Sequence, residues 1–299
     1  MRLGIVASME SAAQSRRRFG QVFDDIATAY DAARPGYPAE LVDVAMKRGG
    51  LRAGSRVLEV GSGTGKLTEL LVARGLLVDA VDPGPNMIEA ARRRLGDVFL
   101  GDGVQFHVGK FEDVSLPEEA FAALFSATAF HWVDPEVAWR KAASHLEPGG
   151  LLALLVHISV RDDHTAEGEE EFRALLRKHA PELAEEIPPS KDLETIIAGA
   201  EKRRGNASEV WDWAMGGYHA VAVPEAAALF ENAELTTLVY RQEWTADEAI
   251  AQFRTTSLYA RIDPAHREAF KDDERSMIER RGGTLQGLQA AVLMTARRL

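Results

Sequence analysis

The chain has 299 residues, and 46% of them are hydrophobic, which is enough to build a core and excludes wholesale disorder. It contains no cysteine, which excludes disulfides, thiolate zinc sites and a catalytic thiol. The net charge is −11 and most of the acidic excess follows His157, whereas a nucleic-acid-binding protein would present a basic face.

Membrane and secretion signals are weak in this sequence. No apolar run approaches the roughly 18 residues of a membrane-spanning helix. The N-terminus, MRLGIVASMESAAQSRRR, has an apolar stretch too short for a secretion signal, and a basic cluster follows it. We therefore expect a cytoplasmic protein with neither a membrane nor a nucleic acid as partner.

Two helices are predicted before residue 51. Apolar residues from Phe19 to Tyr30 recur at steps of three and four, which is the spacing of one helix face. The segment ARPGYP ends this helix, because its two prolines and its glycine cannot continue it. A second helix is expected over Ala39–Lys47, before Gly49 and Gly50.

Between Leu51 and His157, short apolar runs alternate with helical stretches. Strands are predicted at 57–60, 77–81, 104–108, 122–127 and 151–156, and helices at 66–73, 86–95 and 135–146. Strands separated by helices need right-handed crossovers, which produce a parallel sheet. Runs such as LLALLV suit strands covered on both faces. The sequence therefore predicts a doubly wound, Rossmann-like α/β core.

This alternation stops after His157. Residues 162–219 and 246–281 are mostly helical, whereas 235–244 and 289–296 have strand character. We therefore expect a core at 51–157 that is completed by the last helix and strands at 223–245 and 285–299. A helical cap at 158–222 and 246–284 would form the substrate region.

The sharpest local signal is VLEVGSGTGKLT, residues 57–68. A strand leads there into Gly61, Gly63 and Gly65 and then into a helix, so that the backbone can approach a ligand closely. The P-loop pattern fails at positions 60 and 67, where it needs a glycine and a hydroxyl. The spacing GxGxG also weakens a dinucleotide fingerprint, which needs GxGxxG, without eliminating it.

Two acidic residues discriminate among the ligands that such a loop binds. Glu59 lies two residues before Gly61, where a carboxylate would repel a pyrophosphate and suit an ammonium group. Asp82 ends the second strand, where a ribose diol is usually bound. A ribose without phosphates, attached to an amino acid, describes S-adenosylmethionine.

Several motifs together resemble the class I S-adenosylmethionine-dependent methyltransferases. They are the glycine loop, VDP at Val81–Pro83 and EPGG at Glu147–Gly150. FDDIATAYDAARPGYP (Phe23–Pro38) and AFHWVD (Ala129–Asp134) are similar to the small-molecule group, methyltransferase type 11, that includes trans-aconitate methyltransferase-like enzymes. The resemblance is strong over residues 19–157 and weaker beyond.

The resemblance implies S-adenosyl-L-methionine as the cofactor, bound by residues 51–157 and covered by the N-terminal helical segment, residues 1–50. It also implies an antiparallel last strand. Lys110 stands where an acid commonly accepts the adenine amino group, which leaves backbone contacts at Phe111 and Glu112. The implied cofactor-binding residues are Tyr30, Arg34, Glu59, Gly61, Gly63, Gly65, Asp82, Pro83, Met87, Phe111, Glu112 and Ala127.

His131 and Trp132 follow the fourth strand, at the sheet edge where doubly wound folds bind ligands. His131 is the candidate catalytic residue, as a general base, although a substrate hydrogen bond or a structural role would fit the same position. Arginines on the late helices are candidates because a guanidinium binds a carboxylate bidentately. The candidate substrate residues are Trp132, Trp213, Arg254, Tyr259 and Arg261, and no metal site is predicted.

The predicted reaction is in-line transfer of a methyl group to a small organic acceptor: a carboxylate, a hydroxyl or an activated carbon. Positioning alone can supply roughly 7–11 kcal/mol of the barrier, so a general base is optional. Two alternatives stay open. One is a protein that binds S-adenosylmethionine or S-adenosylhomocysteine without transferring methyl, or that serves another reaction, and the other is an NAD-dependent oxidoreductase. Neither the acceptor nor the oligomeric state can be read from the sequence.

Overall fold

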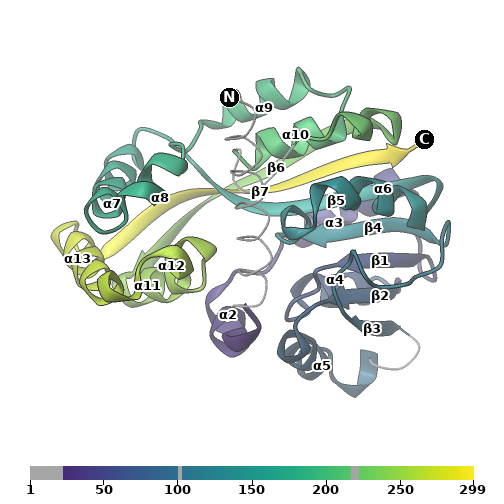
Figure 1. Cartoon of the computed structure of the whole chain (residues 1–299), viewed down its shortest axis with the longest axis horizontal. Coiled ribbons are helices and arrows are strands. Elements are labelled where there is room, and N and C mark those ends of the chain that lie inside the picture. The colour runs from purple at the N-terminus through teal and green to yellow at the C-terminus, as the bar shows by residue number, and fades with distance from the viewer. Residues whose placement is uncertain (1–22, 100–102, 217–221) are drawn as a thin grey trace, which may run out of the picture.

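A seven-stranded sheet with helices on both faces organises the computed structural model, which describes residues 23–99, 103–216 and 222–299 (Figure 1). Its strand order is β3-β2-β1-β4-β5-β7-β6. The strands are β1 (Arg56–Val60), β2 (Leu77–Asp82), β3 (Val104–Val108), β4 (Phe121–Ala127), β5 (Leu146–Val160), β6 (Phe230–Thr245) and β7 (Thr284–Arg298).

Strands β1 to β5 pair in parallel, and β7 runs antiparallel between β5 and β6. The predicted Rossmann-like sheet, mostly parallel with an antiparallel last strand, is therefore confirmed. The chain first adds strands on one side of β1 and then crosses to β4 on the other. Such a reversal opens a crevice at the carboxyl ends of the two central strands, which is where these folds bind ligands.

Apolar side chains from alternate strand positions fill the space on each side of the sheet. One face is covered by α3 (Ala39–Gly49), α4 (Lys66–Val72) and α5 (Pro85–Phe99). The other is covered by η1 (Phe130–Trp132), α6 (Pro135–His145), α9 (Leu193–Glu201), α10 (Ala207–Ala214) and η2 (Pro224–Ala228). The predicted cap at 158–222 is therefore divided, because α9 and α10 place Ile196, Val210 and Trp211 in the core of the sheet.

The remaining helices after β5 form a separate unit, which we call the helical lobe. It lies at the far end of β6 and β7, at the left of Figure 1. Its core includes Leu176, Ile262 and Phe270, which are all buried. No helix within the described ranges is long and apolar enough to cross a membrane. The lobe consists of α7 (Ala166–His179), α8 (Pro181–Glu186), α11 (Ala246–Arg254), α12 (Ser257–Arg261), η3 (Pro264–His266) and α13 (Arg267–Arg280).

Strands β6 and β7 are longer than the sequence pattern predicts, and this length carries the lobe. They pair with each other from Phe230↔Arg298 at one end to Thr245↔Thr284 at the other. The pattern misses the ends of these strands, where polar side chains such as Glu231, Glu234 and Arg297 interrupt the apolar runs. Helix α2 (Ala27–Ala33) contacts both α5 of the core and α11 of the lobe.

Candidate active site

Two adjoining cavities open where the parallel strands end. The first cavity has a volume of about 810 Å³ and extends from the glycine loop and the end of β2 to α10. The second cavity has a volume of about 470 Å³ and lies between the glycine loop and the helical lobe. They share walls at Tyr30, Arg34, Thr128, His157 and Phe253, so that molecules in the two cavities would be neighbours.

The glycine loop connects β1 to α4 and forms part of both cavities. Its first glycine, Gly61, has φ of 73° and donates its backbone N–H to the carbonyl of Val81 at 2.8 Å. A Cβ atom at position 61 would lie 2.1 Å from the Cβ of Ala129. Only glycine fits here, because the loop passes so close to the segment after β4.

Asp82 ends β2 in the wall of the first cavity and is 8% exposed. Its two carboxylate oxygens accept the backbone N–H groups of Gly63 and Gly84, each at 2.8 Å. Burial raises the pKa of Asp82 to about 6, although the two backbone hydrogen bonds oppose this rise. The carboxyl group therefore holds the glycine loop and the start of α5 together at the cavity wall.

Glu59, inside β1, is 1% exposed and lines the second cavity. Its carboxylate accepts the hydroxyl of Thr68 at 2.7 Å. Burial raises the pKa of Glu59 to about 8, and the nearby charge of Asp82 raises it further. No cationic side chain among the described residues lowers the pKa of either acid, so a cationic ligand group beside them would stabilise their ionised forms.

The side of the first cavity near β2 and β3 holds the other residues that the resemblance places around the adenosine. Met87 and Phe111 are buried, at 4% and 3% exposure, and both line the cavity. Glu112 accepts the backbone N–H of Asp134 at 2.9 Å and so fixes the start of α6. Lys110 is exposed at the rim. The predicted residues Pro83 and Ala127 line the same cavity.

Residues 23–38, which we call the N-terminal strap, cross over the glycine loop and are anchored to the core by two acids. Asp24 accepts the backbone N–H groups of Asn86 and Met87 at the start of α5, at 2.8 and 3.1 Å. Asp31 accepts the hydroxyl of Thr64 and the guanidinium of Arg94, each at 2.6 Å. Phe23 and Tyr30 thereby line the first cavity.

The end of the strap is tied to the lobe and to β4. Arg34 donates from its guanidinium to the hydroxyl and the carbonyl oxygen of Thr255, each at 3.0 Å. The hydroxyls of Tyr37 and Thr128 are 2.8 Å apart. Thr128 has φ of 54°, an unusual backbone conformation for a β-branched residue, and it lies at the junction of the two cavities.

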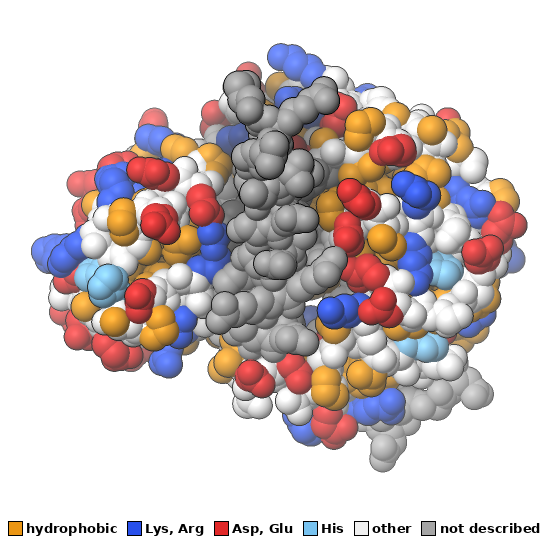
Figure 2. Space-filling model, in the orientation of Figure 1, with side chains coloured by type: hydrophobic (Ala, Val, Ile, Leu, Met, Phe, Trp, Pro, Cys, Tyr) orange, Lys and Arg blue, Asp and Glu red, His pale blue; other side chains and the backbone are white. Residues whose placement is uncertain are grey.

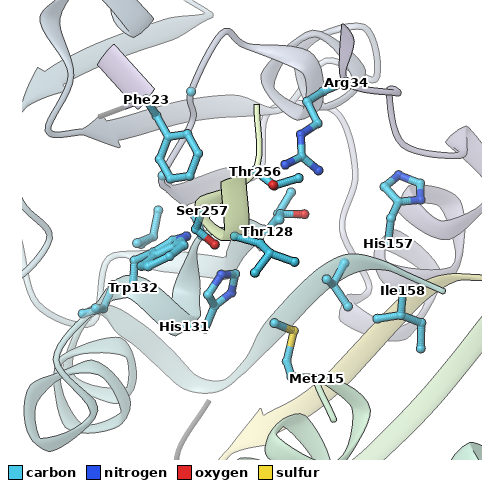
Figure 3. A pocket seen from close by; sticks show the side chains of 18 of the residues that line it. Phe23, Arg34, Thr128, His131, Trp132, His157, Ile158, Met215, Thr256 and Ser257 are labelled. Atoms are coloured by element: carbon cyan, nitrogen blue, oxygen red, sulfur yellow. The ribbon is translucent and has the colours of Figure 1, made fainter. Parts of the chain in front are cut away.

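His131 and Trp132 line the first cavity where the sequence placed them, after β4. Figure 3 shows both side chains beside Thr128, with Ile158 and Met215 on the opposite side. His131 is 7% exposed and its ring centroid lies 5.0 Å from that of Trp132. The Trp132 ring in turn meets Phe23 edge-on at 5.9 Å. This wall of the cavity is therefore largely aromatic.

His157 belongs to both cavities, and the sequence reasoning treated it only as a boundary. Its Nε2 donates to the carbonyl of Gly36 at 3.0 Å, so its Nδ1 accepts the hydroxyl of Tyr240 at 3.0 Å. Burial lowers the pKa of His157, and its ring stacks on Tyr37 at 5.1 Å. Its position at the carboxyl edge of the sheet, after the LLALLV run, was the signal that could have identified it.

Three of the predicted substrate residues line neither cavity, which corrects the sequence prediction. Arg254 lies exposed on the outer side of α11. Arg261 forms an ion pair with Glu186 of α8. Tyr259 packs edge-on against Phe253 at 5.6 Å, inside the lobe. Composition alone could not show which side of these short helices faces the cavity.

Trp213 likewise lines neither cavity, and its half-buried ring packs against the core of the sheet. Its Nε1 donates to the carbonyl of Ile196 at 3.0 Å. Lys191 and Arg203 lie over its ring, 3.7 and 4.2 Å from the centroid. It therefore fixes α9 against α10. Tyr218 and His219, which the sequence grouped with it, lie outside the described residues.

The fold and this site together define a class. A sheet of this order with an antiparallel β7, a glycine loop after β1 and an acid at the end of β2 is the class I methyltransferase arrangement that the sequence motifs resemble. Residues 58–154 match the protein-family model described as a methyltransferase domain. Residues 58–154 therefore form a methyltransferase domain, and the sheet around them has the arrangement of the class I, S-adenosylmethionine-dependent enzymes.

Relatives in other organisms are also named as methyltransferases. The chain is 40% identical over 141 residues to an uncharacterized methyltransferase of Mycobacterium tuberculosis (strain ATCC 25618 / H37Rv), which covers 47% of this chain and 54% of the relative. It is 32% identical over 143 residues to an uncharacterized methyltransferase of Anoxybacillus flavithermus, which covers 45% of this chain and 65% of the relative. The chain thus spans about half the length of the first of these relatives and under two thirds of the second.

A solved structure described as a type II methyltransferase from Anaeromyxobacter dehalogenans shares the fold. It superposes with a TM-score of 0.53 at 22% identity, over 89% of this chain and 97% of that one. The narrower likeness to trans-aconitate methyltransferase-like enzymes stays a prediction.

Proposed function

We propose that this protein transfers the methyl group of S-adenosylmethionine to a small, largely apolar organic acceptor. One observation carries the proposal: the glycine loop, Asp82, His131 and Trp132 all line a single cavity. Its volume of about 810 Å³ is near the top of the range of roughly 300–1,000 Å³ typical of small-molecule sites. It therefore has room for a donor and an acceptor side by side.

The donor would bind along the ends of β1, β2 and β4. Asp82 would accept hydrogen bonds from the ribose hydroxyls, and Met87 and Phe111 would enclose the adenine. Glu59 would lie beside the ammonium group. The aromatic rings of Tyr30 and Trp132 lie near the space left for the sulfonium, where cation–π attraction adds about 0.5–2 kcal/mol.

Methyl transfer itself needs alignment and exclusion of water more than acid–base chemistry. The acceptor nucleophile attacks the methyl carbon in line with the departing sulfur, which leaves as a neutral thioether. His131 lies in the acceptor-side wall and is the candidate base for acceptors whose nucleophile must lose a proton. It remains a prediction.

The walls of the first cavity favour a neutral or apolar acceptor surface over a carboxylate. Two of its basic side chains donate to protein atoms: Arg34 to Thr255 and Lys191 to the carbonyl of Trp213. Figure 2 shows acidic and basic side chains interspersed over the helical lobe, which supports a small molecule over a nucleic acid as the partner.

Titration of the purified protein with S-adenosylmethionine and, separately, with NAD tests the proposal. Binding of NAD without binding of S-adenosylmethionine would favour the oxidoreductase alternative and overturn ours. Tight donor binding, with no labelled methyl group transferred to any fraction of a cell extract, would favour the non-catalytic alternative.

Asp82→Ala is expected to weaken S-adenosylmethionine binding about 10- to 100-fold. The variant loses the ribose contact and also the hydrogen bonds that hold Gly63 and Gly84, and hydrogen bonds to charged groups contribute about 1.5–3 kcal/mol. Isothermal titration calorimetry measures the change. Asp43→Asn is the control, because Asp43 forms an exposed pair with Arg74 outside both cavities. Unchanged affinity in Asp82→Ala would remove Asp82 from the donor site.

Asp31→Asn is expected to weaken donor binding about tenfold with little change in overall stability. It breaks the charged contact to Arg94 and weakens the one to Thr64, so that the strap closes less firmly over the glycine loop. Calorimetry with S-adenosylhomocysteine reports the affinity, and thermal unfolding reports the stability. The reverse pattern, a large loss of stability with unchanged affinity, would make Asp31 a purely structural anchor.

A further inference from the structure

Glu274 is a carboxyl group on the buried side of a helix. In α13 the residues one turn before and after it, Phe270 and Ile278, are fully buried, and Glu274 itself is 2% exposed. On the same helix, Asp272 and Glu279 are exposed, and the half-buried Asp273 pairs with Lys178 and His179. The position of Glu274 is therefore one that the helical pattern would give to an apolar residue.

Glu274 lines the second cavity, whose lining combines apolar and aromatic side chains with charged ones such as Glu169 and Arg173. Within the described residues, no hydrogen bond or ion pair engages this carboxyl, and burial alone raises its pKa to about 7. The surrounding apolar and aromatic wall residues are Phe172, Leu176, Trp244, Phe253 and Leu285.

Two arginines, one on α7, which packs against α13, and one at the end of α13, have other partners. Arg173 of α7 also lines the second cavity, but its guanidinium donates to the carbonyl oxygens of Ala184 and Ile187. Arg281, at the end of α13, pairs with Glu167 and Glu171 of α7. Within the part of the chain that the structure describes, no basic side chain pairs with Glu274.

A buried carboxyl group without a partner destabilises a folded protein, since burial removes its hydration and nothing replaces it. Folding would be better served by leucine or methionine at this position, beside Phe270 and Ile278. Groups of this kind, set in a cavity, are characteristic of binding sites, where the ligand supplies the missing partner. A positively charged ligand group is the partner that a carboxylate in an aromatic wall suits best.

We propose that the second cavity binds a protonated amine of the methyl acceptor, with Glu274 as its counter-ion. This inference rests on the proposed function and narrows its acceptor to an amphipathic amine. The apolar body of the molecule would lie between Phe172 and Phe253, which line both cavities, and would extend toward the donor past Thr128. The bound ammonium carries no free lone pair, so the methylated atom belongs to the opposite end of the acceptor.

The test uses three probes that share one apolar body: 4-phenylbutylamine, 4-phenylbutanol and 4-phenylbutanoate. Each is titrated calorimetrically into the full-length protein saturated with S-adenosylhomocysteine. The wild type is expected to bind the amine at least tenfold more tightly than the carboxylate. Glu274→Gln, which keeps the size of the side chain, is expected to remove this preference and leave binding of the alcohol unchanged.

Glu279→Gln is the matched control, because it removes the same charge from an exposed position on the same helix. It is expected to keep the amine preference of the wild type. Equal affinity of the wild type for the three probes, or a preference that survives Glu274→Gln, would overturn the inference. The titration that saturates the protein with S-adenosylhomocysteine shows first whether the donor site binds. Failure to bind at that step would overturn the proposed function instead. If S-adenosylhomocysteine does not bind but the amine is still preferred through Glu274, the second cavity is an amine site. It is then not the site of a methyl acceptor, and that part of the inference is overturned.

Discussion

Gly61→Ala is expected to abolish donor binding and to destabilise the fold by about 2–5 kcal/mol. The left-handed backbone at φ of 73° costs a residue with a Cβ atom about 1–2 kcal/mol. The new Cβ would also lie 2.1 Å from that of Ala129, and such overpacking costs typically 1–3 kcal/mol. The strain can be relieved only by moving the loop or the segment after β4, and both line the first cavity.

Gly63→Ala separates the two contributions. Gly63 also has a positive φ, of 53°, but no atom lies within 4 Å of a Cβ built there. We expect Gly63→Ala to lower the free energy of unfolding only by the conformational contribution, about 1–2 kcal/mol. Ala129→Gly should restore part of the stability lost in Gly61→Ala, because it removes the other half of the overlap. Urea unfolding and calorimetry with S-adenosylhomocysteine measure both effects. Equal losses in the two glycine variants, without rescue, would show that the contact with Ala129 does not matter.

The parts of this site that the sequence predicts are those encoded locally. Gly61 and Asp82 follow directly after predicted strands, and parallel strands bring their carboxyl ends to one edge. Each of these features, a short apolar run, a glycine loop or the residue that ends a strand, can be recognised from a few consecutive residues of the sequence. Their meeting in one cavity then follows from the topology alone.

Residues that depend on tertiary packing escaped the sequence analysis. Arg261 was a reasonable candidate for binding an acid, but its partner is Glu186, which is remote in the sequence. His157 acquires its position from contacts with Gly36 and Tyr240, which are equally remote. Glu274 did leave a local signal, a lone acid on the apolar side of a helix. That signal becomes informative only once the second cavity shows what the acid faces.

In the absence of ligand, the protein is expected to lose stability as pH rises from 5.5 to 7.5, with Glu59 as one principal cause. The pKa of this carboxyl is 4.5 ordinarily and about 8 in the fold, so the folded state binds more protons across this interval. The contribution of Glu59 to the free energy of unfolding is then fully present below pH 4.5 and is lost as pH rises toward 8. The shift corresponds to a loss of about 2–3 kcal/mol between pH 5.5 and 7.5.

Glu59→Gln isolates this contribution, because Asp82 and Glu274, whose pKa values are also raised, titrate in the same direction. Unfolding free energies of the wild type and the variant, measured with urea at several pH values, should diverge as pH rises, with the variant the more stable at pH 7.5. Glu279→Gln, at an exposed position, should follow the wild type. Parallel curves for wild type and Glu59→Gln would mean that Glu59 keeps an ordinary pKa.

The same linkage predicts how the donor binds. An ammonium group beside Glu59 favours its ionised form, so binding below pH 8 must expel the proton that the free protein holds there. Donor affinity should therefore rise between pH 5.5 and 7.5, an interval in which an α-amino group of pKa roughly 8 stays largely charged. Calorimetry in buffers of different ionisation enthalpy counts the protons released. Release that is absent in Glu59→Gln and present in Glu279→Gln would place the ammonium group at Glu59, whereas equal release in both would place it elsewhere.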